Sequence, residues 1–228
     1  MGSFGKDRKN KTGKAPRALC LLAAVGAMAL SASPAQAQAP TPALANPSLN
    51  VPRTEAMDQA CAQGTATACQ LAVVWGIDQA RASEGVRPLE LPSNYDSLSV
   101  AAQLLVLTNL ERVDRGLPGF TGLSAPLDHL ANKGATANSD PNGPAGRVWG
   151  SNWAGGEASA LLADYDWMYN DGLGSPNLDC TTATPNGCWD HRLIILSNYG
   201  PHPSMGAAWT KVDGVTSLTE LLASAPPE

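Results

Sequence analysis

The clearest hydrophobic pattern in the chain lies between residues 157 and 171. Its apolar residues follow one another at intervals of three and four, the spacing of one face of an α-helix. They are Ala158, Leu161, Leu162, Tyr165, Met168 and Tyr169. The pattern predicts a helix from Glu157 to about Asp171. Asp164, Trp167 and Asp171 form a second stripe of this helix, which can face a cleft.

The same criterion predicts helices in residues 55–82, with an interruption at Gly64 and a resumption around Cys69, in residues 97–115 and 127–138, and in the apolar run 193–196. Leucines cover most of the helix at 97–115, so we expect it to be the most buried, with Asp96 or Ser97 as its N-cap. Asp190 is the expected N-cap of the last helix. The first two helices end in similar motifs, Asp78-x-x-Arg81-x-x-x-Gly85 and Asn109-x-x-Arg112-x-x-x-Gly116, which we attribute to chance because two copies do not make a solenoid.

Strand patterns are shorter and come mainly at the carboxyl end. Residues 148–153 predict a short strand, with two tryptophans as its large side chains. Residues 205–212 and 216–222 are β-compatible runs separated by Asp213-Gly214, a dipeptide typical of tight hairpins. Helices followed by a terminal hairpin predict an α+β domain with an antiparallel sheet.

The amino terminus has the three regions of a secretory signal peptide. A basic run precedes an apolar run from Ala18 to Leu30, and Ala35-Gln36-Ala37 follows as a cleavage site. The apolar run is shorter than the roughly 20 residues that a membrane span needs. We therefore expect a signal peptide at 1–37, a Pro- and Ala-rich linker at 38–54, one domain at 55–225, and a secreted, extracellular or envelope-associated protein without a membrane span.

Net charge and cysteine content narrow the possible functions. The chain has a net charge of −5, which becomes −10 without residues 1–37, and an acidic surface disfavours nucleic acid as a partner. Cys20 lies in the expected signal peptide, and four cysteines follow it. An even number of cysteines is expected of a protein that forms disulfides in an oxidising compartment. Closing short loops costs least entropy, so of the three pairings we expect Cys61 with Cys69 and Cys180 with Cys188. No CxxC pair or histidine at ligand spacing indicates a metal site, and no cofactor is expected.

His191 begins the last helix, directly after the loop that Cys180 and Cys188 can close. A titratable ring at such a corner is either a site residue or a packing residue. We expect His129 to be a surface residue, and His202, between two prolines, to lie in a rigid loop that could reach the rim of a cleft. The nearby tryptophans, if partly exposed, would form an apolar groove wall; they are Trp149, Trp153, Trp167 and Trp189.

Several motifs together resemble the CAP superfamily of SCP-like and PR-1-like secreted domains, over roughly residues 104–222. In chain order they are the Asn109 to Leu117 motif with residues 127–131, Gly150-Ser151-Asn152, the helix centred on Trp167, the segment from Gly187 to Leu196, and Gly206-Ala207-Ala208. The resemblance implies an α-β-α sandwich with a central antiparallel sheet. It also implies a cleft lined by two histidines and two acidic residues.

This sequence keeps one of those four cleft residues, His191. The glutamate of the family's Gly-Glu-Asn motif falls on Ser151, and the second acid falls on Asn170, next to Asp171. Where the other histidine is expected, the chain offers only Asp140 and Asn142. We expect the cleft beside His191 to be formed by Asp140, Ser151, Asn152, Trp153, Trp167, Asn170 and Asp171.

Three functions remain open on this sequence. The favoured one is a secreted binding or interaction module for an apolar or glycan-like, envelope-derived ligand. The second is a hydrolase of peptide or cell-envelope material, with His191 as base and Asp140, Asp171 or Ser151 as its helper. No Gly-x-Ser-x-Gly turn supports that reading. The third is a structural envelope protein whose cleft has no ligand.

Overall fold

The computed structural model describes residues 44–47, 49–182 and 187–227. The expected signal peptide and the first part of the expected linker lie outside these residues. So do Pro185 and Asn186 of Pro185-Asn186-Gly187, which the sequence predicts to be a turn that brings Cys180 and Cys188 together. The helices are α1 (Glu55–Gln63), α2 (Ala66–Ser83), the 3₁₀ turn η1 (Tyr95–Ser97), α3 (Val100–Val113), α4 (Ala125–Ala137), α5 (Ala160–Met168) and α6 (Asp190–Leu196). The strands are β1 (Trp149–Gly155), β2 (Ser204–Val212) and β3 (Val215–Ala223).

The three strands form one antiparallel sheet in the order β1-β3-β2. Strands β2 and β3 are the predicted hairpin, and Asp213 and Gly214 turn it with φ values of 52° and 84°. Both residues therefore adopt the positive φ that a tight two-residue hairpin turn requires. The α+β class and the antiparallel sheet are confirmed.

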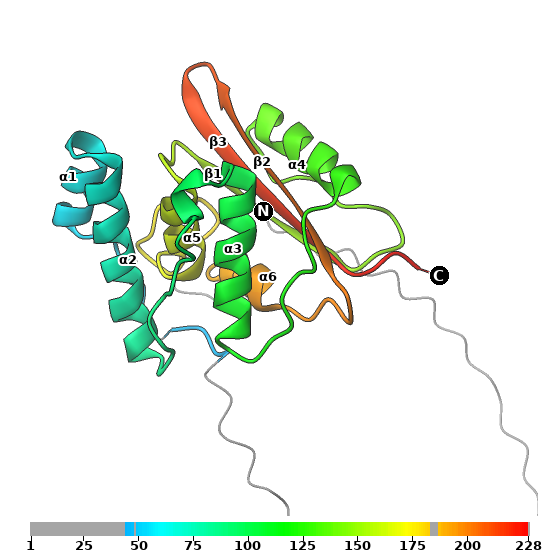
Figure 1. Cartoon of the computed structure of the whole chain (residues 1–228), viewed down its shortest axis with the longest axis horizontal. Coiled ribbons are helices and arrows are strands. Elements are labelled where there is room, and N and C mark those ends of the chain that lie inside the picture. Colours follow the sequence, from blue (N-terminus) through cyan, green and yellow to red (C-terminus); the bar gives the residue numbers. More distant parts are fainter. Residues whose placement is uncertain (1–43, 48, 183–186, 228) are drawn as a thin grey trace, which may run out of the picture. The chain divides into compact units, whose positions relative to one another are not determined.

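Helices pack against both faces of the sheet (Figure 1). Helix α4 covers one face, where Leu127 and Ala131 meet Leu221 of β3. The approach is close, because a Cβ at Gly206 of β2 would collide with the main chain of Leu127. Helices α3 and α6 contact the other face, and α5 packs between α2, α3 and α6. This second side holds the larger hydrophobic core.

Helix α5, not α3, is the most buried helix. Eight of its nine residues are buried, Asp166 being the exception, whereas many side chains of α3 are only half-buried. The predicted start at Glu157 is also wrong, because Ser159 is the N-cap and accepts the main-chain N–H of Leu162. In α3 the N-cap is Ser99 rather than Asp96 or Ser97, which belong to η1.

The similar ends of α2 and α3 are built in the same way. In each, a left-handed glycine ends the helix, and a helical Asp or Asn accepts a main-chain N–H eleven residues further on: Asp78 from Leu89 at 2.7 Å, Asn109 from Phe120 at 2.6 Å. In each, the arginine Nε donates to the carbonyl six residues on: Arg81 to Arg87, Arg112 to Pro118. The sequence similarity thus corresponds to the same local capping structure at two helix ends.

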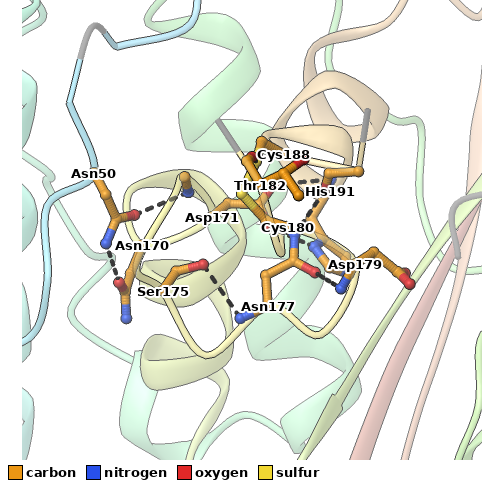
Figure 2. The surroundings of a disulfide bond; sticks show 12 residues. Asn50, Asn170, Asp171, Ser175, Asn177, Asp179, Cys180, Thr182, Cys188 and His191 are labelled. Carbon is orange, nitrogen blue, oxygen red and sulfur yellow. Dashed lines mark hydrogen bonds and ion pairs between the residues drawn. A yellow bond between two sulfur atoms is a disulfide. The ribbon is translucent and has the colours of Figure 1, made fainter. Parts of the chain in front are cut away.

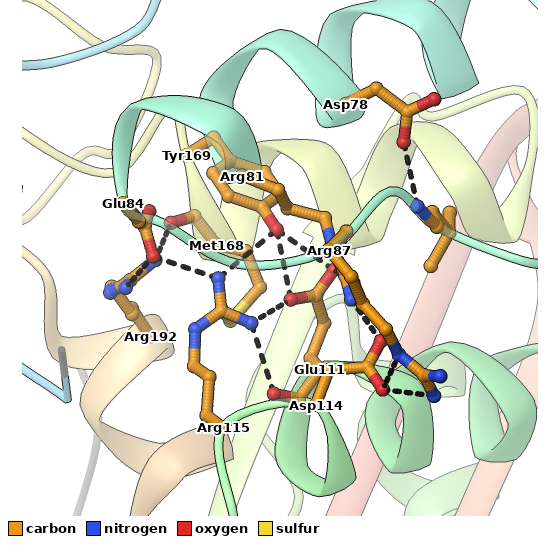
Figure 3. A network of polar contacts seen from close by, with 11 residues as sticks. Asp78, Arg81, Glu84, Arg87, Glu111, Asp114, Arg115, Met168, Tyr169 and Arg192 are labelled. Carbon is orange, nitrogen blue, oxygen red and sulfur yellow. Dashed lines mark hydrogen bonds and ion pairs between the residues drawn. The ribbon is translucent and has the colours of Figure 1, made fainter. Parts of the chain in front are cut away.

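Buried charges join the helices on the larger-core side of the sheet (Figure 3). Glu111 of α3 pairs with Arg81 of α2 at 3.0 Å and with Arg115, and it accepts the hydroxyl of Tyr169. Arg115 also pairs at 2.8 Å with Glu84. Glu111 and both its arginines are fully buried, so none of these charges is hydrated. The ion pairs and hydrogen bonds between them must replace the lost interactions with water.

The two expected disulfides are confirmed. Cys61 pairs with Cys69 and Cys180 with Cys188, with Cα atoms 4.3 and 4.4 Å apart. The first joins α1 to α2, and the second closes the loop between α5 and α6. Among the described residues, no helix is long and apolar enough to cross a membrane.

Candidate functional site

A cavity of about 640 Å³ lies beside the edge strand β1. Its walls come from the segment after α4, from β1, from the end of α5 with the loop that follows, and from His191 of α6. Of the eight residues expected to form a cleft, seven line it: Asp140, Ser151, Trp153, Trp167, Asn170, Asp171 and His191. Asn142 and Trp149 line it as well.

Asp171 holds His191 by two hydrogen bonds (Figure 2). Its Oδ1 lies 2.7 Å from the ring Nδ1, and its Oδ2 accepts the main-chain N–H of His191 at 3.1 Å. When Asp171 is ionised, its carboxylate can only accept hydrogen bonds, and Nδ1 of His191 is then the donor. Nε2 is therefore the ring nitrogen that Asp171 does not engage.

The second of these bonds replaces the expected cap of α6. Asp190 is the first residue of the helix rather than its N-cap, and Trp189, at the cap position, has a φ of 64° and no capping side-chain bond. Asp171, twenty residues away, accepts at the helix N-terminus instead. Asn177 fixes this arrangement by donating to Asp171 at 2.6 Å and to the carbonyl of Gly187 at 2.9 Å.

Burial and charge set the protonation of this pair. Burial lowers the pKa of His191, but the hydrogen bond and charge of Asp171 and the charge of Asp140 outweigh burial, so the pKa is raised. Burial raises the pKa of Asp171, with His191 opposing the shift. Burial also raises the pKa of Asp140. The imidazole is thus favoured in its charged form by the two carboxyl groups.

Strand geometry explains why Asn152 does not line the cavity. Successive side chains of a strand point to opposite faces, so Ser151 and Trp153 line the cavity while Asn152 points away. Asn152 instead donates to Glu220 at 2.7 Å and to the carbonyl of His191 at 3.2 Å. Burial raises the pKa of Glu220 to about 7. Asn152 therefore does not contact the cavity but helps to hold the main chain of His191 in place.

Tryptophans form the apolar part of the wall. Trp149 and Trp153 are half-buried, whereas Trp167 is only 3% exposed. The indole N–H groups fix two of the rings: Trp153 donates to Ser217 at 2.9 Å and Trp167 to the carbonyl of Trp153 at 3.3 Å. Trp189 does not line the cavity. The rings are held in place, so a ligand meets preformed surfaces.

A second acidic group lines the cavity and was not predicted. Glu157 and Asp166 both pair with Arg53, whose Nε lies 3.0 Å from Asp166 Oδ1. Asn170 donates to Asp166 at 3.0 Å and accepts from Asn50 at 2.7 Å. Burial and the charge of Asp166 raise the pKa of Glu157 to about 7, against the opposing effect of Arg53.

One pair in this group has a signal in the sequence. Asp166 and Asn170 are four residues apart, a spacing that places two side chains on the same face of a helix. Asn50 and Arg53 gave no such signal, because they come from the segment assigned to a linker. They nevertheless bind to α5 and its C-terminal end.

Other candidates lie elsewhere. His129 is exposed, as expected, and His202 does not line the cavity. Asp164 does not line it either, because it is buried in the core near Glu111 and Glu220. Within the described ranges, no group of three or more His, Cys, Asp or Glu residues is arranged to hold a metal ion.

Comparison of the chain with protein-family models, with curated proteins and with solved structures finds no match. The resemblance to the CAP superfamily therefore stays a prediction. The function has to be argued from the cavity and the residues around it.

Proposed function

We propose that this protein is a secreted binding module on a CAP-like α-β-α scaffold, and that its cavity binds a glycan-like ligand derived from the cell envelope. The observation that carries the proposal is the cavity itself. It combines tryptophan rings with several oxygen acceptors in about 640 Å³, a size within the range of ligand pockets.

The lining suits a polyhydroxylated ligand. Flat indole faces such as that of Trp153 can stack on the C–H face of a sugar ring, and carboxylate and amide oxygens can accept its hydroxyl groups. Ser151 adds an unused group: it is 1% exposed, and its Oγ has no hydrogen-bond partner among the described residues. Because this Oγ is buried from solvent, a ligand hydroxyl would reach it only if neighbouring side chains moved.

The arrangement of elements supports the CAP-like scaffold. Helix α4 lies on one face of the antiparallel sheet and α3 and α6 on the other, as an α-β-α sandwich requires. His191 lies in the cavity with Ser151 and Asn170, at the positions that the resemblance assigned to the cleft. The two disulfides suit an oxidising compartment and hence secretion.

Calorimetric titration with neutral and amino-bearing oligosaccharides tests the proposal. We expect binding by the wild type and at least a tenfold loss in Trp153→Ala, about 1.4 kcal/mol. Trp75→Ala is the matched control, because Trp75 is 58% exposed on α2 and does not line the cavity. Absence of binding to every oligosaccharide, or equal losses in the two variants, would overturn the proposal.

A hydrolase is the second candidate, and the His191–Asp171 pair favours it. Asp171 orients the ring and stabilises its charged form, as the orienting acid of a general base does. Ser151 makes no hydrogen bond to His191 in this structure, so a serine nucleophile is not assembled. Any turnover of peptide or envelope substrates should disappear in His191→Ala. Activity that survives this change would exclude the assignment.

A further inference from the structure

The charged residues around the cavity are almost all acidic. Its lining contains five carboxylates and one imidazole, and no lysine or arginine among the described residues that form it. The carboxylates belong to Asp140, Glu157, Asp166, Asp171 and Asp179. A concave site with one sign of charge concentrates ligands of the opposite sign. Among the described residues of the wall, His191 is the only side chain that can carry a positive charge.

The Glu157–Asp166 end of the cavity is short of positive charge. The two carboxyl groups share one guanidinium, that of Arg53, and their side chains are only 15% and 12% exposed. The pKa of Glu157, raised to about 7, is the physical sign of this shortage, since burial and a like charge disfavour its ionised form. A cation that enters the cavity here would pair with the second carboxylate.

Two further features of this region suit an organic cation with hydroxyl groups. Trp153 and Trp167 line the same cavity as Glu157 and Asp166, and indole faces attract cations. Ser151, two residues before Trp153 on the same face of β1, has a buried hydroxyl that makes no hydrogen bond among the described residues. An acidic group, aromatic faces and an unused hydrogen-bonding group therefore meet in one cavity.

Resting on the proposed function, we infer that the ligand is a glycan with free, unacetylated amino groups, and that Glu157 and Asp166 receive one of its ammonium groups. The tryptophans then contact the sugar rings. The ammonium group would balance the negative charge that Arg53 leaves uncompensated, whereas a neutral acetamide would not. The cavity should therefore bind an amine more tightly than the acetamide on the same sugar backbone.

The test compares two tetrasaccharides that differ only in this group. One is a β-1,4-linked glucosamine tetrasaccharide, whose amines take up protons near neutral pH, and the other is its fully N-acetylated form. Calorimetry on the folded protein at low salt should give at least a tenfold tighter dissociation constant for the amine, about 1.4 kcal/mol. Added sodium chloride should reduce this preference, because salt screens charge pairs.

Glu157→Gln removes one carboxylate while keeping its shape, and it should reduce the amine preference roughly threefold or more, by analogy with the loss of a partly exposed ion pair. Glu90→Gln makes the same charge change at an exposed position away from the cavity and should leave the preference unchanged. Thermal unfolding of both variants checks that each is folded. The salt series is measured on the wild type, so it tests the inference even if a variant does not fold.

The outcomes separate this inference from the proposed function. Equal binding of both sugars, or tighter binding of the acetylated one, would overturn the inference and leave the proposed function standing. Binding of neither sugar would count against both. An amine preference that survives in Glu157→Gln and at high salt would overturn the assignment to Glu157 and Asp166.

Discussion

Asp171 binds His191 twice, through the ring Nδ1 at 2.7 Å and through the main-chain N–H at 3.1 Å. One buried carboxylate thus caps helix α6 and orients the imidazole beside the cavity. The stability of α6 and the protonation state of His191 are linked through the Asp171 carboxylate. Any change at Asp171 should alter both.

Asp171→Asn should lower the pKa of His191, because the ring loses the negative charge that favours its protonated form. It should also destabilise the fold by about 1–3 kcal/mol, since a charged acceptor at a helix N-terminus is lost. NMR titration of the His191 ring and thermal unfolding measure the two effects. Asp190→Asn makes the same charge change beside the site without removing a bond to the ring. A similar pKa change in both variants would contradict the role given to Asp171.

The two disulfides close loops of equal length, so their removal should cost similar stability. A sequence separation of eight corresponds to about 2.5 kcal/mol in the loop-entropy model. Their effects on the cavity should differ, because Asp179, which lines it, directly precedes Cys180. Double Cys→Ser variants, compared by thermal unfolding and by oligosaccharide titration, should both lose stability. Only the Cys180/Cys188 variant should also lose binding; a binding loss in both would contradict the account.

The folded state should lose stability as the pH rises from mildly acid to neutral. The Glu220 carboxyl has an ordinary pKa of 4.5, and burial raises it to about 7 in the fold. Between these values the folded chain binds more protons than the unfolded chain, so stability falls by up to about 1.4 kcal/mol per pH unit. Glu157 and His191, whose pKa values are also raised, act in the same direction.

Denaturant unfolding across this pH range measures the slope. Glu220→Gln keeps an oxygen that can accept from Asn152 and removes the titrating group, so the decline should become shallower. Stability that rises with pH, or an unchanged slope in the variant, would show that Glu220 does not titrate as proposed.

Glu111→Gln should destabilise the fold by about 3–5 kcal/mol, because Arg81 and Arg115 would keep buried charges with too little compensation. Asp58→Asn is the contrasting variant: Asp58 is 58% exposed and lies 4.0 Å from Arg53, a pair of the kind worth at most about 1 kcal/mol. Chemical unfolding of both variants gives the comparison. Equal losses of stability in the two variants would mean that the buried ion pairs of Glu111 contribute no more than the exposed pair of Asp58 and Arg53.

The features that could be predicted from the sequence are those formed by residues close together in the chain. The apolar spacing of α5, the Asp213-Gly214 turn and both disulfides involve residues within about one or two turns or a short loop, and all appear in the structure. The start of α5 was wrong because Glu157 pairs with Arg53 while Ser159 caps the helix.

The rest depends on contacts between distant residues. The cap of α6 is Asp171, which lies in a different segment from the expected Asp190, and no local rule points to it. The same holds for Arg53, which reaches Asp166 across more than a hundred residues. Asn152 was misplaced for a local reason, since strand alternation turns it away from Ser151. Seven of the eight expected cleft residues line one cavity, but no signal in the sequence pointed to Asn50 and Arg53, which complete its second acidic group.

The most direct measurement of the central claim is an NMR titration with the glucosamine tetrasaccharide that follows the tryptophan indole N–H signals and the His191 ring. The account predicts that the signals of Trp153, Trp167 and His191 shift together, with one dissociation constant, while that of Trp75 on the exposed face of α2 stays in place. A shift of Trp75 to the same extent, or no shift of the three cavity residues at any sugar concentration, would contradict the claim that this cavity binds a glycan.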